Sequence, residues 1–242
     1  DVQIAGCLKD KPSEDDVRAK RINAGIVPVT KQIDTLSAEF PAETNYLYMT
    51  YHGTESDPGL GSQASQSRSA LILGCGSYRI GTSVEFDWCG VSCSRKLQEE
   101  QWRSIILNCN PETVSTDYDT SNRLYFEPLT LEDVLEVVHA ETQAGPVLGV
   151  ITQLGGQTPL GLAAGLKANG VTILGTSPEA INLAEERGAF GNILAEQGLT
   201  APQFGMASSQ LEATTIAHEI GYPVLVRPSF VLGGRGMEIV YD

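Results

Sequence analysis

Short apolar runs alternate with helical stretches along the chain from residue 69 onward. The apolar runs span residues 70–73, 104–107, 147–152 and 171–174, and the helical stretches between them span 84–101, 130–141 and 158–170. Strands of this kind separated by helices predict an α/β fold with a parallel sheet and right-handed crossovers. Ligands of such sheets collect at the carboxyl ends of the strands. Because Gly- and Asn-rich stretches follow the apolar runs, we expect a site at that edge.

The residues before this pattern differ from it. Residues 1–8 fit the end of a helix, and Ser13 is predicted to cap a second helix that begins with acids and ends near Gly25. Residues 27–51 mix polar and apolar positions without a clear period, so we expect irregular structure there. Residues 53–68 are small and polar and cannot bury a core, which predicts a linker.

The pattern changes again after residue 185. One helix is predicted to end at Gly198, and another is predicted over residues 208–221. Strands are predicted over residues 223–227 and 237–241, and the glycine-rich turn between them indicates a hairpin. We therefore expect a domain boundary near residue 185.

The composition narrows the class of protein. Apolar residues make up 41% and charged residues 19% of the chain, which is typical of globular proteins. The net charge of −14 repels nucleic acid and anionic lipid, so we expect neither as a partner. No run of 18 apolar residues predicts a transmembrane helix. The chain begins with Asp1 and ends in a predicted strand, so we expect a piece of a longer protein.

Cysteines and histidines offer no metal or hydrolase site. The five cysteines are odd in number and irregularly spaced, which indicates reduced thiols in a cytosol-like compartment. Cys89 and Cys93 could share one helix face, but no CxxC motif or nearby histidine completes a metal set, so we interpret them as buried apolar residues. His52, His139 and His218 are scattered without a Ser or Cys partner, and the latter two are interpreted as structural.

A glycine-rich stretch over residues 74–81 follows the first apolar run and precedes a helix. Arg79 stands where the third glycine of GxGxxG would fall. The second run ends at Asn108 and Asn110, where a nicotinamide site needs an acid for the ribose. The stretch therefore argues against a dinucleotide site and leaves two interpretations, a tight turn or a backbone cradle for an anion.

Acidic residues lie on the loops that follow the first two predicted strands. Glu85 and Asp87 stand at the start of a helix, and Glu112 and Asp117 follow the second apolar run. Acids at these positions either complement a helix N-terminus and a turn, or line a polar passage above the sheet. The pattern alone leaves both interpretations open.

Arg227 ends a predicted strand and is followed by Gly233 and Gly234. Arginine forms bidentate bonds with phosphate oxygens, and glycines let a loop close over phosphates without steric conflict. The pattern predicts a triphosphate site, although many hairpins also have Gly-Gly tips. Arg187 could reach the same phosphates, or it could form a surface ion pair.

Several ordered motifs resemble those of carbamoyl phosphate synthetase large subunits. The strongest is residues 108–119 (Asn-Cys-Asn-Pro-Glu-Thr-Val-Ser-Thr-Asp-Tyr-Asp), continued by residues 123–127. Residues 155–159, 174–178 and 226–234 match further motifs, so the similarity is specific and covers nearly the whole chain. The family's large subunit is a tandem duplication, and residues 79–81 with 85–89 resemble its second, C-terminal copy.

This resemblance implies a domain order and a reaction. Residues 1–67 would end the helical oligomerisation domain and include a linker, 68–185 would form a Rossmann-like pre-ATP-grasp domain, and 186–242 would open an ATP-grasp domain. The second copy of the family phosphorylates carbamate with ATP to give carbamoyl phosphate, mostly by positioning and charge neutralisation.

The resemblance also implies roles for individual residues. Arg187, Arg227, Gly233 and Gly234 match residues that bind ATP, and Glu85 and Glu112 match carboxylates of the tunnel that delivers carbamate. Ser83 stands where bacterial relatives have glycine, which affects the local tunnel width. No catalytic residue or metal ligand of the family falls within these residues, because the ligands for Mg²⁺ (with Mn²⁺ as an alternative) come later in the family's sequence. We therefore expect the chain alone to be inactive and to bind ATP weakly.

The family further implies a glutaminase small subunit or domain as a partner, self-association through the helical domain, and a cytoplasmic location, with a mitochondrial one as the alternative. Two other classes were weighed. A biotin carboxylase-like or purine-pathway ATP-grasp ligase is disfavoured by residues 108–119, and a degenerate interaction module is disfavoured by the retained Arg227, Gly233 and Gly234.

Overall fold

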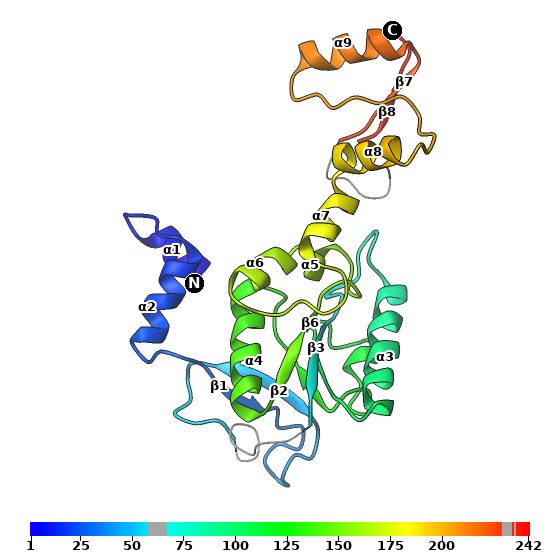
Figure 1. The fold of residues 1–242 in the computed structure, drawn as a ribbon. Coiled ribbons are helices and arrows are strands. Elements are labelled where there is room, and N and C mark those ends of the chain that lie inside the picture. Colours follow the sequence, from blue (N-terminus) through cyan, green and yellow to red (C-terminus); the bar gives the residue numbers. More distant parts are fainter. Residues whose placement is uncertain (58–66, 229–233, 235) are drawn as a thin grey trace. The chain divides into compact units, whose positions relative to one another are not determined.

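A computed structural model describes residues 1–57, 67–228, 234 and 236–242 (Figure 1). Within these residues the chain forms two compact units, Asp1–Gly175 and Thr176–Asp242. Among the described residues, no helix is long and apolar enough to cross a membrane.

The first unit is built on a six-stranded sheet that confirms the predicted parallel α/β fold. The strands lie in the order β1 (Val29–Gln32), β2 (Tyr46–Thr50), β5 (Arg123–Tyr125), β4 (Arg103–Leu107), β3 (Ser69–Leu73) and β6 (Val147–Ile151). All neighbouring pairs are parallel except β1 and β2. An antiparallel strand at the edge of a parallel sheet is common in α/β folds.

Two long helices lie on opposite sides of the sheet (Figure 1). Helix α3 (Val84–Glu99) connects β3 to β4, and α4 (Leu131–Ala144) connects β5 to β6. The N-terminus of α4 has the predicted cap, since the Thr130 side chain accepts from the backbone N–H of Asp133. The chain runs from β3 through β4 to β5 on one side and then crosses to β6 on the other side of β3, so the strand order reverses between β3 and β6.

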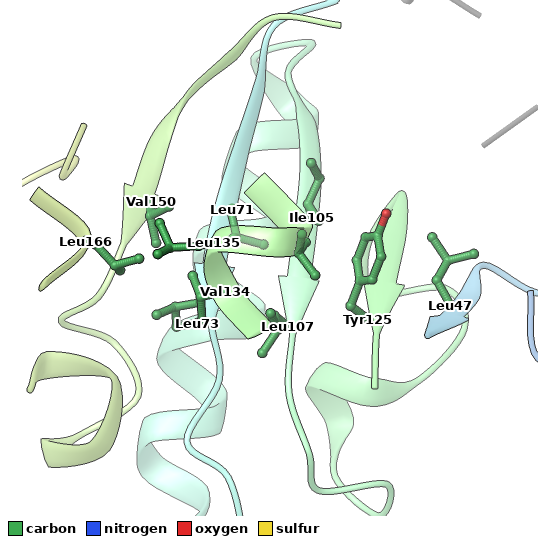
Figure 2. Close-up of a cluster of buried hydrophobic side chains, with 11 residues drawn as sticks. Leu47, Leu71, Leu73, Ile105, Leu107, Tyr125, Val134, Leu135, Val150 and Leu166 are labelled. Atoms are coloured by element: carbon green, nitrogen blue, oxygen red, sulfur yellow. The ribbon is translucent and has the colours of Figure 1, made fainter. Parts of the chain in front are cut away.

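The core of the first unit lies mainly between the sheet and α4. Leu71, Leu73, Ile105 and Leu107 from the central strands pack with side chains of α4 and α6 (Ala163–Ala168) and are at most 1% exposed (Figure 2). A smaller cluster of Ile72, Ile106 and Leu124 lies on the other face. The central strands are therefore buried on both faces, which explains why they appear in the sequence as continuous apolar runs.

The N-terminal residues contain more sheet than the sequence indicated. Helices α1 (Val2–Cys7) and α2 (Glu14–Asn23) agree with the prediction, and Ser13 forms a capping box with Asp16 at the start of α2. The expectation of irregular structure over residues 27–51 was wrong, because β1 and β2 lie there and extend the sheet. Both strands mix polar and apolar residues because only part of each strand is buried.

Buried ion pairs tie α2 to α4. The Arg21 guanidinium donates to both carboxylate oxygens of Asp1 at 3.0 Å and to Glu136 at 2.7 Å, and Arg18 also pairs with Glu136. Arg21 also lies over the ring of Tyr51, 5.3 Å from its centroid. Charged groups in a low-dielectric environment need such partners, so this cluster fixes the N-terminal helices against α4.

A second buried ionic cluster lies at the amino ends of the central strands. Glu141, which is 1% exposed, accepts from Arg103 at 2.6 Å, from Arg123 at 2.7 Å and from the Tyr125 hydroxyl at 2.6 Å. Burial raises the pKa of Tyr125, so its hydroxyl keeps the proton that it donates. The cluster joins the end of α4 to β4 and β5.

Two predicted elements of the first unit are shorter than expected. Residues 171–174 do not form a full strand, although Ile173 makes a parallel bridge with Val150. The helix expected over residues 158–170 is divided into α5 (Gln157–Leu160) and α6. Strand β5 was missed, because three residues are too few to show a period.

The second unit contains three helices and a hairpin. The helices are α7 (Pro178–Glu185), α8 (Arg187–Glu196) and α9 (Gln210–Ile220), and the Ser177 side chain caps α7. Strands β7 (Val224–Val226) and β8 (Glu238–Val240) pair antiparallel, which confirms the predicted hairpin. The loop residues 229–233, including Gly233, lie outside the described residues.

Candidate functional site

The loops that follow β3 and β6 meet at the carboxyl edge of the sheet. A Cβ on Gly155 would overlap with the carbonyl oxygen of Gly74, so these two loops touch through their backbones. A Cβ on Gly156 would in turn lie 3.0 Å from the Thr82 hydroxyl oxygen. Glycine at these positions therefore lets three chain segments approach closely at the point where the strand order reverses.

Asn108 organises this edge. Its side chain is fully buried, accepts from the backbone N–H of Gly76 at 3.0 Å and donates to the Ser115 hydroxyl at 3.1 Å. The N–H of Gly76 is thus engaged within the protein, and Gly76 has the positive φ of +69° that glycine tolerates. The glycine-rich stretch behaves at this residue as a tight turn held by a neighbouring loop.

The predicted passage residues Ser83, Glu85 and Glu112 lie on loops and a helix start at this edge. Ser83 precedes α3 and is half-buried, while Glu85 in the first turn of α3 is exposed. Glu112 is also exposed, and its backbone N–H donates to the Asn110 side chain at 3.0 Å. Neither carboxylate points into the apolar core.

Asp87 connects α3 to the loop after β4. It is 3% exposed, and one carboxylate oxygen accepts from the backbone N–H of Ser115 at 3.0 Å. Its other carboxylate oxygen and the buried Thr82 hydroxyl have no hydrogen-bond partner among the described residues. The sequence left Asp87 as either a helix-start acid or a residue of a polar passage, and its contact with the distant Ser115 leaves no mark on the local pattern.

In the second unit, Arg187 contacts the residue that follows Arg227. Arg187 begins α8, is half-buried, and donates to the carbonyl oxygen of Pro228 at 3.4 Å. Arg227 directly precedes Pro228 and is exposed. Within the described part of the chain, neither arginine pairs with a carboxylate, so both guanidinium groups retain charge for an anionic ligand.

Glu186 occupies the N-terminus of α8 beside Arg187. Its carboxylate accepts from the backbone N–H groups of Gly188 at 2.9 Å and Ala189 at 2.6 Å. These hydrogen bonds lower the pKa of Glu186, with the bond from Ala189 as the largest cause. The N-terminus of α8 is therefore capped by the Glu186 side chain. A phosphate would then be bound by the arginine side chains and not by the N–H groups of Gly188 and Ala189. Gly234, with φ of +72°, is the described glycine of the predicted loop.

Metal-binding clusters are not found in the described residues, since no group of three or more His, Cys, Asp or Glu side chains converges there. A shallow hollow of about 460 Å³ borders α8 and α9, lined by residues that include Ala195, Phe204 and Ile220. It contains none of the predicted site residues.

Two family models match the chain in succession. Residues 66–183 match the carbamoyl phosphate synthase preATP-grasp domain, and residues 186–242 match the carbamoyl-phosphate synthase L chain ATP binding domain. The chain belongs to the carbamoyl phosphate synthase large-chain family. Both matches agree with the resemblance that the motifs carry.

Curated relatives support the same assignment. The carbamoyl phosphate synthase large chain of Streptomyces coelicolor is 61% identical over 229 residues, which cover 95% of this chain and 20% of the relative. That of Corynebacterium glutamicum is 56% identical and covers all of this chain and 22% of the relative. The chain thus spans about a fifth of the length of these relatives.

The fold is shared with a more distant enzyme. The biotin carboxylase domain of Hydrogenobacter thermophilus 2-oxoglutarate carboxylase, solved with MgADP, ADP and bicarbonate, superposes with a TM-score of 0.52. The similarity covers 74% of this chain and 38% of that one at 21% sequence identity, and therefore describes the fold alone. A pre-ATP-grasp domain followed by the start of an ATP-grasp domain explains this likeness.

Proposed function

We propose that this chain takes part in the ATP-dependent synthesis of carbamoyl phosphate, as part of the half that phosphorylates carbamate. The observation that carries the proposal is the contact of Arg187 with Pro228, the residue after Arg227, together with the lack of a carboxylate partner for either arginine among the described residues. Membership of a family whose second matching model is an ATP binding domain supports a triphosphate as their ligand. The likeness of residues 79–89 to the second copy supports carbamate as the acceptor.

The chemistry requires charge neutralisation more than proton transfer. A carbamate oxygen would attack the γ-phosphorus of ATP, and the bond from that phosphorus to the β,γ-bridging oxygen would break. Arg187 and Arg227 would hold phosphate oxygens and balance the negative charge that spreads over them. Gly233 and Gly234 would let the loop backbone cover the phosphates. Mg²⁺, or Mn²⁺ in its place, would add positive charge when bound with the nucleotide.

The passage residues belong to the first unit. We propose that Ser83, Glu85 and Glu112 line the route by which carbamate reaches the site of phosphorylation. Their exposure at the carboxyl edge, where ligands of parallel sheets bind, supports this role. Ser83 in place of a glycine would narrow the route by one hydroxymethyl group.

The proposed partners follow from the family. A glutaminase subunit or domain would supply ammonia, the helical segment would contribute to self-association, and the enzyme would work in the cytoplasm or, as the alternative, in mitochondria. The proposed domains remain 1–67, 68–185 and 186–242.

A chimera tests the function directly. In the Streptomyces coelicolor large chain, the matching segment would be replaced by this chain, and Arg227 or Arg187 would be changed to Gln. We expect carbamoyl phosphate synthesis to fall by about 10²–10³-fold, since each change removes a charged donor to the transferred group. The hydrolysis of ATP that requires bicarbonate alone should persist, because it would occur in the first copy within the large chain.

The control variant is Arg95→Gln. Arg95 lies on α3 over the Trp88 ring, 5.7 Å from its centroid, and has no proposed role in ATP binding. Synthesis that is unchanged in Arg227→Gln, or equally reduced in Arg95→Gln, would contradict the proposal. For the isolated chain, isothermal titration with MgATP should show affinity weaker than micromolar, and tighter binding would refute the expectation that this piece binds ATP weakly.

A further inference from the structure

Cys75 and Cys109 occupy equivalent positions after two adjacent strands. Strands β3 and β4 are parallel and in register up to the pair Leu73 and Leu107. The ladder continues one step further, since the backbone N–H of Gly74 donates to the carbonyl oxygen of Leu107 at 2.8 Å. Each cysteine stands two residues beyond the last registered pair, so both lie on neighbouring loops at the same edge of the sheet.

The spacing of the two strands that lead to these cysteines is compatible with a disulfide. Adjacent strands lie about 4.8 Å apart, and disulfides join Cα atoms separated by roughly 4.4–6.8 Å. The sulfur atoms of both cysteines lie beside Gly76. The Cys75 sulfur is 3.5 Å from the Gly76 carbonyl oxygen, and the Cys109 sulfur is 3.5 Å from the place where a Cβ on Gly76 would stand. The absence of that side chain leaves the space between the loops clear.

The two thiols differ in exposure. Cys75 is fully buried, and burial, followed by the nearby negative charge of Asp87, raises its pKa to about 11. Cys109 is exposed and both thiols are free. An exposed thiol beside a buried one is the arrangement in which an oxidant reaches one sulfur first and the second sulfur resolves the product.

We propose that Cys75 and Cys109 form a site of oxidative modification, at which a hydroperoxide converts the two thiols into a disulfide. The Cys109 thiolate attacks one oxygen of hydrogen peroxide and the O–O bond breaks, which gives a sulfenic acid and a hydroxide; the hydroxide takes up the proton that the Cys109 thiol released and becomes water. The Cys75 sulfur then attacks the Cys109 sulfur, the S–O bond breaks, and the departing hydroxide takes the Cys75 proton as water. Two thiols and one peroxide thus give one disulfide and two waters.

The disulfide would join two loops of the site. One carries the turn at Gly74 and Gly76, and the other carries Asn108 and Glu112. On the proposed function, on which this consequence alone rests, the bond would hold the carboxyl edge in one arrangement and slow carbamate transfer. The modification itself is independent of that function, because it requires only the two sulfur atoms and an oxidant.

Mass spectrometry of the full chain tests the proposal. The chain would be exposed to hydrogen peroxide, free thiols would be blocked with N-ethylmaleimide, and the digest would be searched for a peptide pair joined through Cys75 and Cys109. We expect that pair as the main product, reversed by dithiothreitol. In Cys75→Ala, Cys109 should stop at the sulfenic acid and react with dimedone, whereas in Cys109→Ala Cys75 should stay reduced.

Cys89 and Cys93 provide a matched pair within the same unit. They also combine an exposed and a more buried thiol, but they lie four residues apart on α3, where Cβ atoms are about 5–6 Å apart. That exceeds the 3.5–4.5 Å between the Cβ atoms of a disulfide, so they should remain free thiols.

Two outcomes would overturn the proposal. One is oxidation of Cys109 to sulfinic or sulfonic acid while Cys75 stays free, with circular dichroism showing that the chain is folded. The other is formation of the Cys89–Cys93 bond at an equal rate. The chimera would also be assayed before and after oxidation. If the disulfide forms but carbamoyl phosphate synthesis is unchanged, the modification is supported and only its effect on carbamate transfer is refuted.

Discussion

Substitution of Glu141 tests whether the buried ionic cluster holds the first unit together. The change Glu141→Gln keeps the shape of the side chain and one acceptor oxygen but removes the negative charge. Arg103 and Arg123 then remain with side chains only 13% and 12% exposed and without the carboxylate that both of them contact. The change therefore removes one partner from a buried network rather than the whole network.

The expected loss in the free energy of unfolding follows from removing only one partner of the network. Removing one partner of a buried ion pair costs about 3–5 kcal/mol, because the remaining charge stays desolvated. The amide oxygen of glutamine can still accept one hydrogen bond, so we expect a loss of about 3 kcal/mol in the free energy of unfolding of the first unit. Replacing the whole cluster by apolar groups should cost less, since no uncompensated charge is left.

Hydrogen exchange measures this loss at its place in the fold. Peptides that cover β4 and β5 would be followed by mass spectrometry across a urea titration, which reports the opening of the first unit separately from the second. The control is Glu99→Gln, because Glu99 pairs with Lys96 on the surface with both side chains more than 60% exposed. Such pairs contribute about 0–1 kcal/mol.

Two results would refute the reasoning. A loss from Glu141→Gln as small as that from Glu99→Gln would mean that water reaches the cluster and screens its charges. A triple change of Glu141, Arg103 and Arg123 to Leu, Met and Met that is less stable than Glu141→Gln alone would mean that the ion pairs themselves, and not the stranded charges, supply the energy.

Three further changes have distinct expected results. Gly155→Ala places a methyl group against the backbone of the facing glycine turn, so thermal unfolding should show a loss of more than about 1 kcal/mol, whereas Gly6→Ala in open space should be neutral or slightly stabilising. Burial raises the pKa of Glu127 from 4.5 to about 7, so the folded state binds a proton that the unfolded chain has released. Its contribution to stability is present at low pH and lost as the pH rises through about 7, and urea titrations of Glu127→Gln should lack this fall. Thr130→Ala removes the cap of α4 and should cost about 1 kcal/mol in the same titration.

The central strands and the capped helices were predictable because local sequence determines them. Strands β3 and β4 are buried on both faces and therefore form continuous apolar runs. The caps at Ser13, Thr130 and Ser177 depend on a hydroxyl and a backbone N–H only three residues apart, so the pattern that predicts them also contains their partner.

The remaining features depend on partners far away in the sequence. Strand β2 forms because its backbone pairs with β5, whose registered residues lie more than seventy positions later. The contacts of Arg21 with Glu136, and of Arg123 with Glu141, likewise follow from helix packing and not from any local spacing. The pattern of apolar residues identifies a strand that is buried on both faces. It does not identify a half-exposed strand that forms because a neighbouring strand pairs with it.

Asn108 is informative both in the local sequence and through its contacts with distant residues. In the sequence it argued against a nicotinamide site, because an acid is needed there to hold the ribose. In the structure its amide accepts from Gly76 and donates to Ser115 while fully buried. A neutral amide can accept and donate at once without the desolvation cost of a carboxylate, so it joins two loops where an acid would need a cation. The residue that excludes one ligand is therefore also the residue that positions the loops proposed to carry carbamate.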